Sequence, residues 1–472
     1  HLTPRNACDA RVVAVHAVPS LLEMAAARGK ATGMVSTARL THATPGATYA
    51  HTAARDWESD AEVAAACPGH ATPVKDIARQ LIEAPPAVRQ NLKVALGGGR
   101  SMFMPRGVAD PEYAARTGRR LDGRDLTAER RIVARVSEVY ERWGFEPLET
   151  GAFEYADALG KFLPDADRPN EGVFALQDDD EQWMALRYDL TAPLARFAAQ
   201  GWETLPKPFR RYAYGPVWRN EKPGPGRFRE FWQCDADTVG SDRPEADAEI
   251  IAMACEGLGA AGLDAGQAQI RVSNRKLFDG LFDAGGVTDA GQRLTALRAI
   301  DKFDRLGWEG VVQLLGEGRL DESGDYTKGA RLPAKVTGAI EAFLASANTP
   351  GLSRAATLEA VARSGDLGAA GEAALNELAA IDRALNAMSV GQDAVKFDPT
   401  IVRGLEYYTG AVFEAELLLE TTDDKGRPVR FGSIGGGGRY DDLVARFTGE
   451  RTPATGFSFG VSRLAAALRA AG

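Results

Sequence analysis

The stretch that decides the fold is RNEKPGPGRFREFWQCDADTVG, residues 219–240. The preceding residues 209–218, FRRYAYGPVW, are aromatic and β-branched and predict a strand, while residues 231–239 alternate bulky and polar side chains and predict the returning strand. The intervening PGPG of residues 223–226 cannot continue either strand, so we expect a loop there. Three arginines and one acidic residue bracket this loop: Arg219, Arg227, Arg229 and Glu221.

Such a hairpin suits a triphosphate ligand, because arginine holds phosphate oxygens in a bidentate fork. The loop is not a Walker loop, since no Gly-Lys-Ser/Thr follows it. The alternative for an arginine-rich turn is a solvated, charged hairpin without a ligand. Residues 219–240, however, match a family signature almost without interruption. They resemble motif 2 of class II aminoacyl-tRNA synthetases, in the version carried by histidyl-tRNA synthetases.

Three further stretches carry the same resemblance, which covers residues 128–472. Residues 397–414, FDPTIVRGLEYYTGAVFE, resemble the signature peptide of histidyl-tRNA synthetases, with Glu406 where Asp is commoner. Residues 431–444, FGSIGGGGRYDDLV, contain the family's second signature, GGRYD, in a glycine run that lets the backbone lie close to a ligand. Residues 455–464, TGFSFGVSRL, alternate as a strand, break into a helix and resemble motif 3.

The resemblance implies roles for several charged residues around ATP. Arg219 and Arg403 would contact the α-phosphate, where a fixed guanidinium stabilises the transition state more than the ground state. Arg463 would hold the γ-phosphate, Arg227 would also bind ATP, and Glu221 would lie near the nucleotide. Mg²⁺ would bridge phosphate oxygens. The alternative for Arg403 is a surface arginine at the head of a strand.

A second group of residues would bind L-histidine. Asp189 and Thr191 match the family's amino-acid-binding loop, which more often has Glu in the first position, and would hold the ammonium group. Taken alone, Asp189 is an ordinary helix cap. Gln233 would bind the amino-acid end, and Asp237 would accept a hydrogen bond from a ring N–H, because a neutral imidazole has one donor and one acceptor nitrogen. The resemblance adds four more residues to this group: Arg403, Tyr407, Tyr408 and Tyr440.

Of the two adjacent tyrosines, one is expected to contact the ligand and the other to pack in the core. Tyr407 and Tyr408 would lie on opposite faces of one strand, so only one of them can face the ligand. The resemblance places Tyr408 on the side of the histidine pocket, where Tyr440 would also lie.

The first third of the chain has a different pattern. We expect a helix at residues 22–28, ended by Gly29, and a strand at residues 32–37. A second helix at residues 76–83 precedes a strand that enters the turn GGG at residues 97–99. This alternation predicts part of a parallel sheet with helices on both faces.

Residues 21–126 resemble alkaline phosphatases. Matched to that family, Thr44 would be a magnesium ligand, His42 its neighbour and Arg55 the arginine that clamps the substrate phosphate. The family's nucleophilic serine lies upstream of the matched segment, most of its zinc ligands lie downstream, and the chain has five histidines. We therefore expect no phosphatase activity, because the Lewis acid and the activated nucleophile are both missing. The resemblance rests on residues 35–45, 49–60, 96–100 and 118–126.

Composition restricts the class of protein. A chain of 472 residues with 44% hydrophobic and 26% charged residues predicts a globular protein of two to four domains. The net charge of −9 argues against a general nucleic-acid coat but is compatible with a tRNA ligand. No apolar run is long enough for a membrane span. The cysteines Cys8, Cys67, Cys234 and Cys255 form no Cys-x-x-Cys pair, which argues against a zinc knuckle or disulfide scaffold and for a reducing cytoplasm.

We therefore expect an alkaline-phosphatase-like α/β fragment at residues 1–127, followed by an α+β class II synthetase core. That core would combine residues 128–275 and 391–472 around an antiparallel β-sheet, with a helical insertion domain at residues 276–390. A strand predicted at residues 145–150 occupies the position of motif 1, the dimer-forming element of this class. The resemblance thus implies a cytoplasmic homodimer.

The activity implied is the ATP-dependent conversion of L-histidine to histidyl-adenylate, followed by transfer to tRNA(His). The family continues past motif 3 into an anticodon-binding domain, whereas the printed sequence stops there. One alternative is therefore a synthetase-like regulatory subunit of histidine biosynthesis that lacks the same domain. Retention of Arg403 and of a complete motif 2 argues against it, because a regulator need not keep transition-state groups. A third reading, an alkaline phosphatase fragment, rests on the first third of the chain alone.

Overall fold

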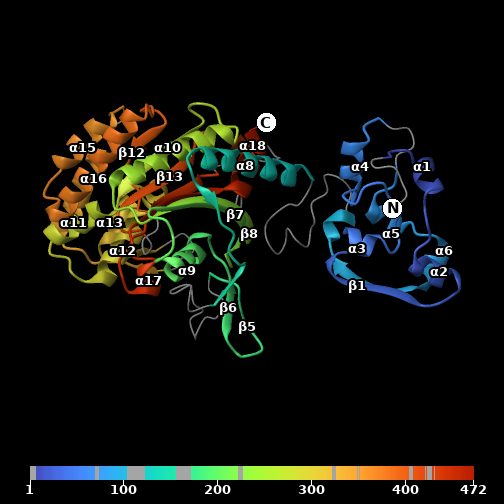
Figure 1. Ribbon diagram of the computed structural model, residues 1–472. Helices are drawn as coiled ribbons and strands as arrows, with labels where there is room; N and C mark the ends of the chain where they lie inside the picture. Colours follow the sequence, from blue (N-terminus) through green and yellow to red (C-terminus); the bar gives the residue numbers. More distant parts are fainter. Residues whose placement is uncertain are drawn as a thin grey trace. The chain divides into compact units, whose positions relative to one another are not determined.

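Figure 1 shows the computed structural model of the chain. The chain divides into two compact units, His1–Thr127 and Ala128–Gly472, which are described separately. The structure describes residues 7–69, 74–103, 123–155, 172–221, 227–320, 326–347, 349, 351–402, 408–419, 421–422, 428–429 and 431–471.

The first unit contains a small parallel sheet. Strand β1 (Thr32–Arg39) pairs in parallel with β2 (Leu92–Gly98), as the sequence predicts. Met34 is buried against the helices, but Val35 and Leu96 point to the other face and are 75% and 61% exposed. The expectation of helices on both faces is therefore wrong for the described part of this unit. Its helices are α1 (Ala10–Val15), α2 (Leu21–Ala27), α3 (Ala43–Gly46), α4 (Asp60–Ala66), α5 (Ile77–Ile82), α6 (Pro86–Asn91) and the 3-10 helix η1 (Arg100–Phe103).

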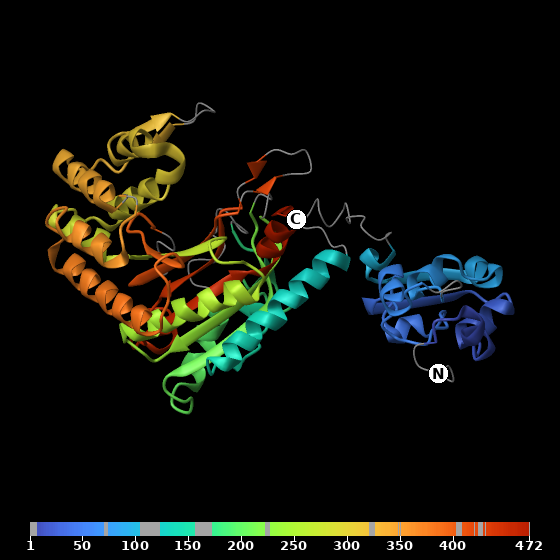
Figure 2. The ribbon, with the colours of Figure 1, turned by 90° about the horizontal axis from the view of Figure 1, so that it is seen from above.

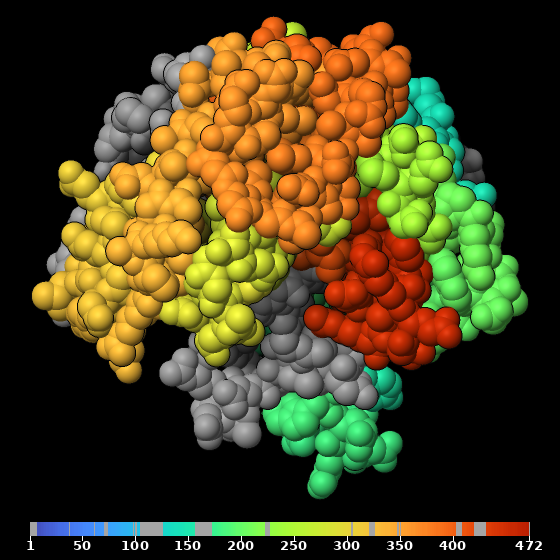
Figure 3. All heavy atoms as spheres, turned by 90° about the vertical axis from the view of Figure 1, so that its left-hand side faces the viewer, coloured from blue at the N-terminus to red at the C-terminus, as the bar shows by residue number. Residues whose placement is uncertain are grey.

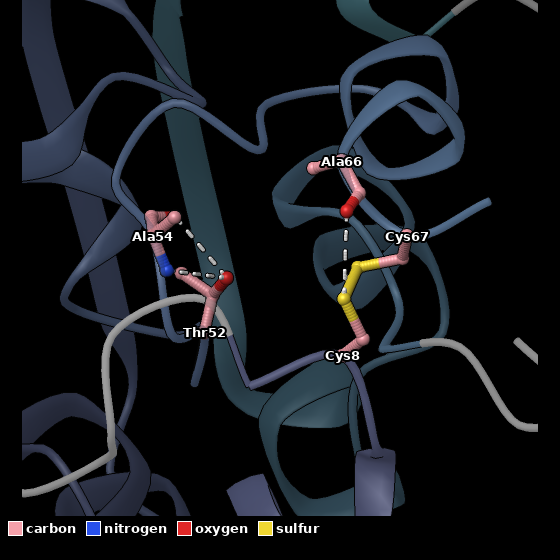
Figure 4. The surroundings of a disulfide bond; sticks show 5 residues. All are labelled: Cys8, Thr52, Ala54, Ala66 and Cys67. Atoms are coloured by element: carbon pink, nitrogen blue, oxygen red, sulfur yellow. Dashed lines mark hydrogen bonds between the residues drawn. A yellow bond between two sulfur atoms is a disulfide. The ribbon is translucent and has the colours of Figure 1, made fainter.

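A disulfide joins Cys8, just before α1, to Cys67 at the end of α4 (Figure 4). Their Cα atoms are 5.6 Å apart, and Cys67 packs in a small core with Trp57. One disulfide is present although the cysteine spacing argued against a disulfide scaffold, because two cysteines far apart in sequence become partners only when the chain folds back. Cys234 and Cys255 are free thiols.

The second unit is built on an eight-stranded sheet. Neighbouring strands run antiparallel except for the parallel pairs β12–β9 and β3–β7, which confirms the predicted antiparallel-rich α+β core. The two strands predicted around residues 219–226 are neighbours in this sheet. In order across the sheet, the strands are β12 (Val395–Phe397), β9 (Ala268–Asn274), β13 (Ala411–Leu417), β16 (Ser433–Arg439), β17 (Ala454–Gly460), β8 (Glu230–Val239), β7 (Phe209–Trp218) and β3 (Glu146–Pro147).

Helices α8 (Gly123–Arg142) and α10 (Pro244–Ala260) cover one face of this sheet (Figures 1 and 2). Tyr140 of α8 stacks on Phe459 of β17 at 6.5 Å between ring centres, and Cys234 of β8 lies in the same core. Side chains alternate along a strand, so the even-numbered residues of β8 face these helices. The odd-numbered residues of β8 therefore face the opposite side.

Helix α9 (Thr191–Gly201) lies on that opposite side, where Phe197 packs against Phe209 at the start of β7. The short helix α17 (Ala445–Thr448) and the last helix, α18 (Val461–Ala471), follow the central strands. Among the described residues, no helix combines the length and the apolar character needed to cross a bilayer. The smaller strands are β4 (Phe153–Tyr155), β5 (Ala175–Gln177), β6 (Trp183–Leu186), β14 (Thr421–Thr422) and β15 (Pro428–Val429).

The region after β9 is mainly helical, as predicted, and its yellow and orange atoms form one continuous surface in Figure 3. Arg354 is buried within it and donates to Asp382 Oδ1 at 2.6 Å. Its side chains share one hydrophobic core with the sheet, so the division into insertion domain and catalytic core stays a prediction. The elements are α11 (Lys276–Ala284), α12 (Ala290–Ile300), α13 (Phe303–Leu315), β10 (Gly318–Leu320), β11 (Tyr326–Lys328), α14 (Ala334–Ala347), α15 (Arg354–Ala362) and α16 (Gly368–Ala387).

Candidate active site

A cavity of about 380 Å³ opens on the side of the sheet opposite α8 and α10. Strands β8, β16 and β17 form its floor, and the segment before α9 and the ends of the β7–β8 hairpin form its walls. Most of the predicted site residues meet here although they are far apart in sequence. Those lining the cavity are Asp189, Thr191, Arg219, Glu221, Arg227, Gln233, Tyr408 and Arg463.

Arg219, which follows β7, lies between two aromatic rings. Its Cζ atom is 4.3 Å from the centre of the Tyr188 ring and 5.0 Å from that of Phe231. Stacking engages the faces of a guanidinium, whereas hydrogen bonds to phosphate use its edge, so the rings orient Arg219 without competing for a phosphate. Glu221 is fixed nearby, since its Oε1 accepts a hydrogen bond from the Tyr188 hydroxyl at 3.3 Å.

Arg463 enters the same cavity from the first turn of α18. Its Nη1 donates to the Ser433 carbonyl at 2.6 Å, which anchors the side chain beside β16. Arg219 and Arg463 therefore line one cavity, and their roles at the phosphates stay predictions. Arg403 and Tyr407, also predicted for this site, lie outside the described residues.

Asp189 both caps α9 and lines the cavity. Its Oδ1 accepts hydrogen bonds from the backbone N–H groups of Thr191 at 3.1 Å and Ala192 at 2.9 Å. Burial raises the pKa of this carboxyl group, and these hydrogen bonds and Arg219 lower it. The helix-cap interpretation of Asp189 is thus observed, and it leaves the carboxylate placed for a ligand as well.

Asp237 and Tyr440, two of the residues expected to bind the imidazole, are buried together beside the cavity but do not line it. The Tyr440 hydroxyl donates to Asp237 Oδ1 at 2.5 Å. Arg211 Nη2 lies 3.1 Å from Asp237 Oδ2. Burial raises the pKa of Asp237, while Arg211 and Tyr440 lower it.

Tyr408 lines the cavity but precedes its strand, because β13 begins at Ala411. The expectation that Tyr408 lies within a strand is therefore wrong. Its ring packs against Gly438, where an added Cβ would come within 2.8 Å of the tyrosine Cδ1. Gly438 also has a φ of +156°, which favours glycine.

The glycine run of β16 serves close packing between strands. A Cβ at Gly437 would lie 2.1 Å from the Gly456 carbonyl, and one at Gly435 would lie 2.8 Å from the Phe457 ring. A Cβ at Gly436 would meet only the Phe413 carbonyl, at 3.5 Å, and this glycine lines the cavity. The sequence predicted a close approach to a ligand. The observed close approach is mainly to β17, with Gly436 keeping the cavity open.

Four further residues line the cavity that no motif indicated: Tyr188, Phe231, Asp235 and Ser458. Asp235 is 1% exposed, and burial raises its pKa to about 8; Asp237 raises that pKa further, and Arg211 lowers it. The alternation that predicted β8 already places Gln233, Asp235 and Asp237 on one face, so that signal was present in the sequence.

The residues that match alkaline phosphatases are arranged differently. Thr44 is exposed, and the Arg55 side chain is 65% exposed with Asp56 at 3.8 Å. The buried carboxylate of Glu58 accepts hydrogen bonds from the Arg39 guanidinium and, at 2.6 Å, from the Thr41 hydroxyl. Within the ranges that the structure describes, no three His, Cys, Asp or Glu side chains cluster so as to hold a metal ion. His42, the second residue of the magnesium-site match, precedes α3.

The second unit has the core of a class II aminoacyl-tRNA synthetase. Its sheet is mostly antiparallel, Arg219 follows the hairpin strand β7, and Arg463 lies where β17 gives way to α18. A family model described as histidyl-tRNA synthetase matches residues 119–464, and one described as alkaline phosphatase matches residues 8–142. The histidine–tRNA ligase of Caulobacter vibrioides is 70% identical over 368 residues, which cover 78% of this chain and 72% of that one. The chain belongs to the histidyl-tRNA synthetase family.

Solved structures agree with the fold. Histidyl-tRNA synthetase from Nostoc sp. PCC 7120 superposes with a TM-score of 0.56 at 28% identity, covering 72% of this chain and 71% of that chain. A Bacillus halodurans structure titled ATP phosphoribosyltransferase regulatory subunit/histidyl-tRNA synthetase has a TM-score of 0.57 at 24% identity, covering 73% and 79%. The second likeness shows the fold alone.

Proposed function

We propose that the chain is a histidine–tRNA ligase, which forms histidyl-adenylate from L-histidine and ATP and then transfers the histidyl group to tRNA(His). The observation that carries this proposal is the meeting of Arg219 and Arg463 with Asp189 and Gln233 around one cavity. Guanidiniums suit a nucleotide triphosphate, and the carboxylate and amide suit the polar end of an amino acid.

In the first step, a carboxylate oxygen of histidine attacks the α-phosphorus of ATP. The bond between that phosphorus and the bridging oxygen to the β-phosphate breaks, and pyrophosphate leaves. Arg219, oriented by Tyr188 and Phe231, stabilises the charge that grows on the α-phosphate, and Arg403 is proposed to act with it. Arg463 and Arg227 hold the outer phosphates, with Glu221 near the nucleotide. No side-chain nucleophile is needed, because the substrate carboxylate attacks.

Histidine is held at the other end of the cavity. Asp189 and Thr191 bind its ammonium group, Gln233 binds the amino-acid end, and the imidazole lies against Tyr408. The buried pair of Asp237 and Tyr440, with Tyr407, completes the imidazole site. Support for this arrangement comes from the hydrogen bond between Asp237 and Tyr440, which combines an acceptor with a hydroxyl beside the cavity wall.

The proposal extends to cofactor, assembly and location. Mg²⁺ would arrive with ATP and would offset the negative charge of its phosphates, with Glu221 as the acidic cavity residue proposed to lie near the nucleotide. The active protein is proposed to be a cytoplasmic homodimer, with residues 128–275 and 391–472 as its catalytic core and residues 276–390 as a helical insertion domain.

The test is histidine-dependent exchange of pyrophosphate into ATP. The ligase predicts exchange that requires histidine and is abolished by Arg403→Ala. A synthetase-like regulatory subunit predicts little exchange in the unmodified protein, so the first measurement separates the two. Charging of tRNA(His), measured next, tests the transfer step independently of activation.

A further inference from the structure

The floor of the cavity contains a buried carboxylate that the assignments above do not use. Asp235 is 1% exposed and still lines the cavity. It lies midway between Gln233 and Asp237 on β8, so the three side chains project from one face of the strand. Ser458 is its direct partner on β17, and Gly436 lies opposite Ser458 on β16 without a side chain that could cover it.

Ser458 fixes the direction of these polar groups. Gln233 Nε2 donates to Ser458 Oγ at 2.8 Å, so the amide oxygen of Gln233 is the end left to accept a hydrogen bond. The Ser458 hydroxyl can then donate its own proton to Asp235. In the part of the chain that the structure describes, Gln233 Oε1 and Asp235 Oδ1 are buried without a hydrogen-bond partner. The floor therefore presents, within this part of the chain, two buried oxygens without a partner, and a bound cation would favour the ionised form of Asp235 over the protonated form that burial favours.

We propose that Asp235 binds the α-ammonium group of the amino-acid substrate, together with Gln233 and Asp189. This inference rests on the proposed function and adds a residue to its substrate site. An ammonium group carries three N–H donors and can satisfy acceptors on two walls of the cavity at once. Its positive charge also offsets the repulsion among the carboxylates, which Arg211 offsets only in part.

The arrangement makes Asp235 a specificity-determining residue. A ligand without the ammonium group leaves both acceptors buried and unpaired, and a site built to hydrogen-bond a substrate group rejects analogues that lack it. Asp235 thus selects α-amino acids over their deaminated analogues, whereas Asp237 and Tyr440 are proposed to recognise the ring.

The test is equilibrium binding by calorimetry on the full chain. Three probes are used: L-histidine, L-histidinol, which keeps the ammonium group but lacks the carboxylate, and 3-(imidazol-4-yl)propanoate, which lacks the ammonium group. Asp235→Asn is expected to weaken histidine and histidinol about 10-fold to 100-fold, because a charge-assisted hydrogen bond is lost. Binding of the propanoate is expected to change less than about twofold. Asp279→Asn, a half-buried aspartate in α11, is the matched control and should change none of the three.

Thermal melting and ATP affinity of each variant establish that the fold and the nucleotide site are intact. If Asp235→Asn does not fold, Asp235→Ser replaces it, since serine keeps a partner for Ser458 but carries no charge. Unchanged histidine affinity in a folded variant would overturn the inference while leaving the proposed function standing. An equal loss for the propanoate would also overturn it, because the residue would then act on the ring or on the fold. Absence of histidine binding by the unmodified chain would instead overturn the proposed function itself.

Discussion

The two units differ in how much of a sheet each one contains. In the second unit, eight strands are neighbours and helices α8 and α10 bury one face, so that the other face can hold a cavity. In the first unit, two strands are paired, and Val35 and Leu96 on one face stay 75% and 61% exposed. Parallel sheets are ordinarily covered on both faces. The synthetase motifs of the second unit therefore form a cavity on a large sheet, whereas the phosphatase-like residues of the first unit are not gathered into a site by its described sheet.

Two arginines illustrate this difference. The resemblances assign phosphate binding to both Arg219 and Arg55. Arg219 is held between two rings in the cavity, whereas the Arg55 side chain is 65% exposed and lies 3.8 Å from Asp56. An exposed guanidinium beside an exposed carboxylate contributes little binding energy.

The largest effect is expected on the stability of the second unit. Arg354→Ala should lower its free energy of unfolding by about 3–5 kcal/mol, because the change leaves Asp382 buried without its cation. Urea denaturation followed by tryptophan fluorescence measures the loss. Arg363→Ala, which removes an exposed i,i+4 pair with Glu359, should change stability by less than about 0.5 kcal/mol. Equal effects of the two variants would contradict a stabilising role for the buried ion pair between Arg354 and Asp382.

The second expected effect is on activation. Arg219→Ala should reduce kcat for pyrophosphate exchange about 100-fold to 1,000-fold, because a preorganised cation is lost from the transition state. Arg219→Lys should restore only part of the rate, since lysine keeps the charge but neither the fork nor the stacking between Tyr188 and Phe231. Full activity of the lysine variant would show that a point charge suffices and that the aromatic rings do not position this residue.

Reduction of the disulfide is expected to affect the first unit alone. Loss of the Cys8–Cys67 bond should destabilise this unit by about 2–4 kcal/mol, because the unfolded chain regains the freedom of the loop between them. Hydrogen exchange with and without reductant, read peptide by peptide, localises the change. Protection of α8 and α10 should stay constant, and a matching loss there would mean that the two units unfold together.

A pH dependence of stability is expected in the second unit. Burial raises the pKa of Asp235 to about 8, so the folded chain holds this proton at pH values where the unfolded chain has released it. The stability from this group is complete below the unfolded pKa of about 4 and is lost as the pH rises towards 8. The stability of Asp235→Asn relative to that of the unmodified chain should therefore rise as the pH goes from 4 to 8, because asparagine has no proton to release. A difference that stays constant across this range would contradict the raised pKa.

The smallest effect is expected at Arg55. With zinc and magnesium supplied, the chain should release no phosphate from a generic phosphate ester, and Arg55→Ala should change nothing, because the described residues of the first unit hold no metal-binding cluster. Phosphate release that depends on Arg55 would revive the phosphatase alternative and weaken the contrast between the two arginines.

The sequence alone determined the local elements and the family. The strand at residues 231–239 and the helix that Asp189 caps depend on neighbours a few residues away, so they can be predicted without a fold, whereas the loop predicted at residues 223–226 lies outside the described residues. Signature peptides likewise predicted Arg219, Asp189 and Gln233 as cavity residues because the family match covers them.

Tertiary structure decided which side chains meet. Gln233 and Ser458 are 225 positions apart and become partners only when β17 pairs with β8, and this pairing makes Asp235 part of the floor. The disulfide between Cys8 and Cys67 and the exposed face of the first sheet were equally unpredictable from local patterns. These features share one physical reason. The burial and the partners of a side chain depend on segments that are distant in the chain, and the residues next to it in sequence do not specify where those segments lie.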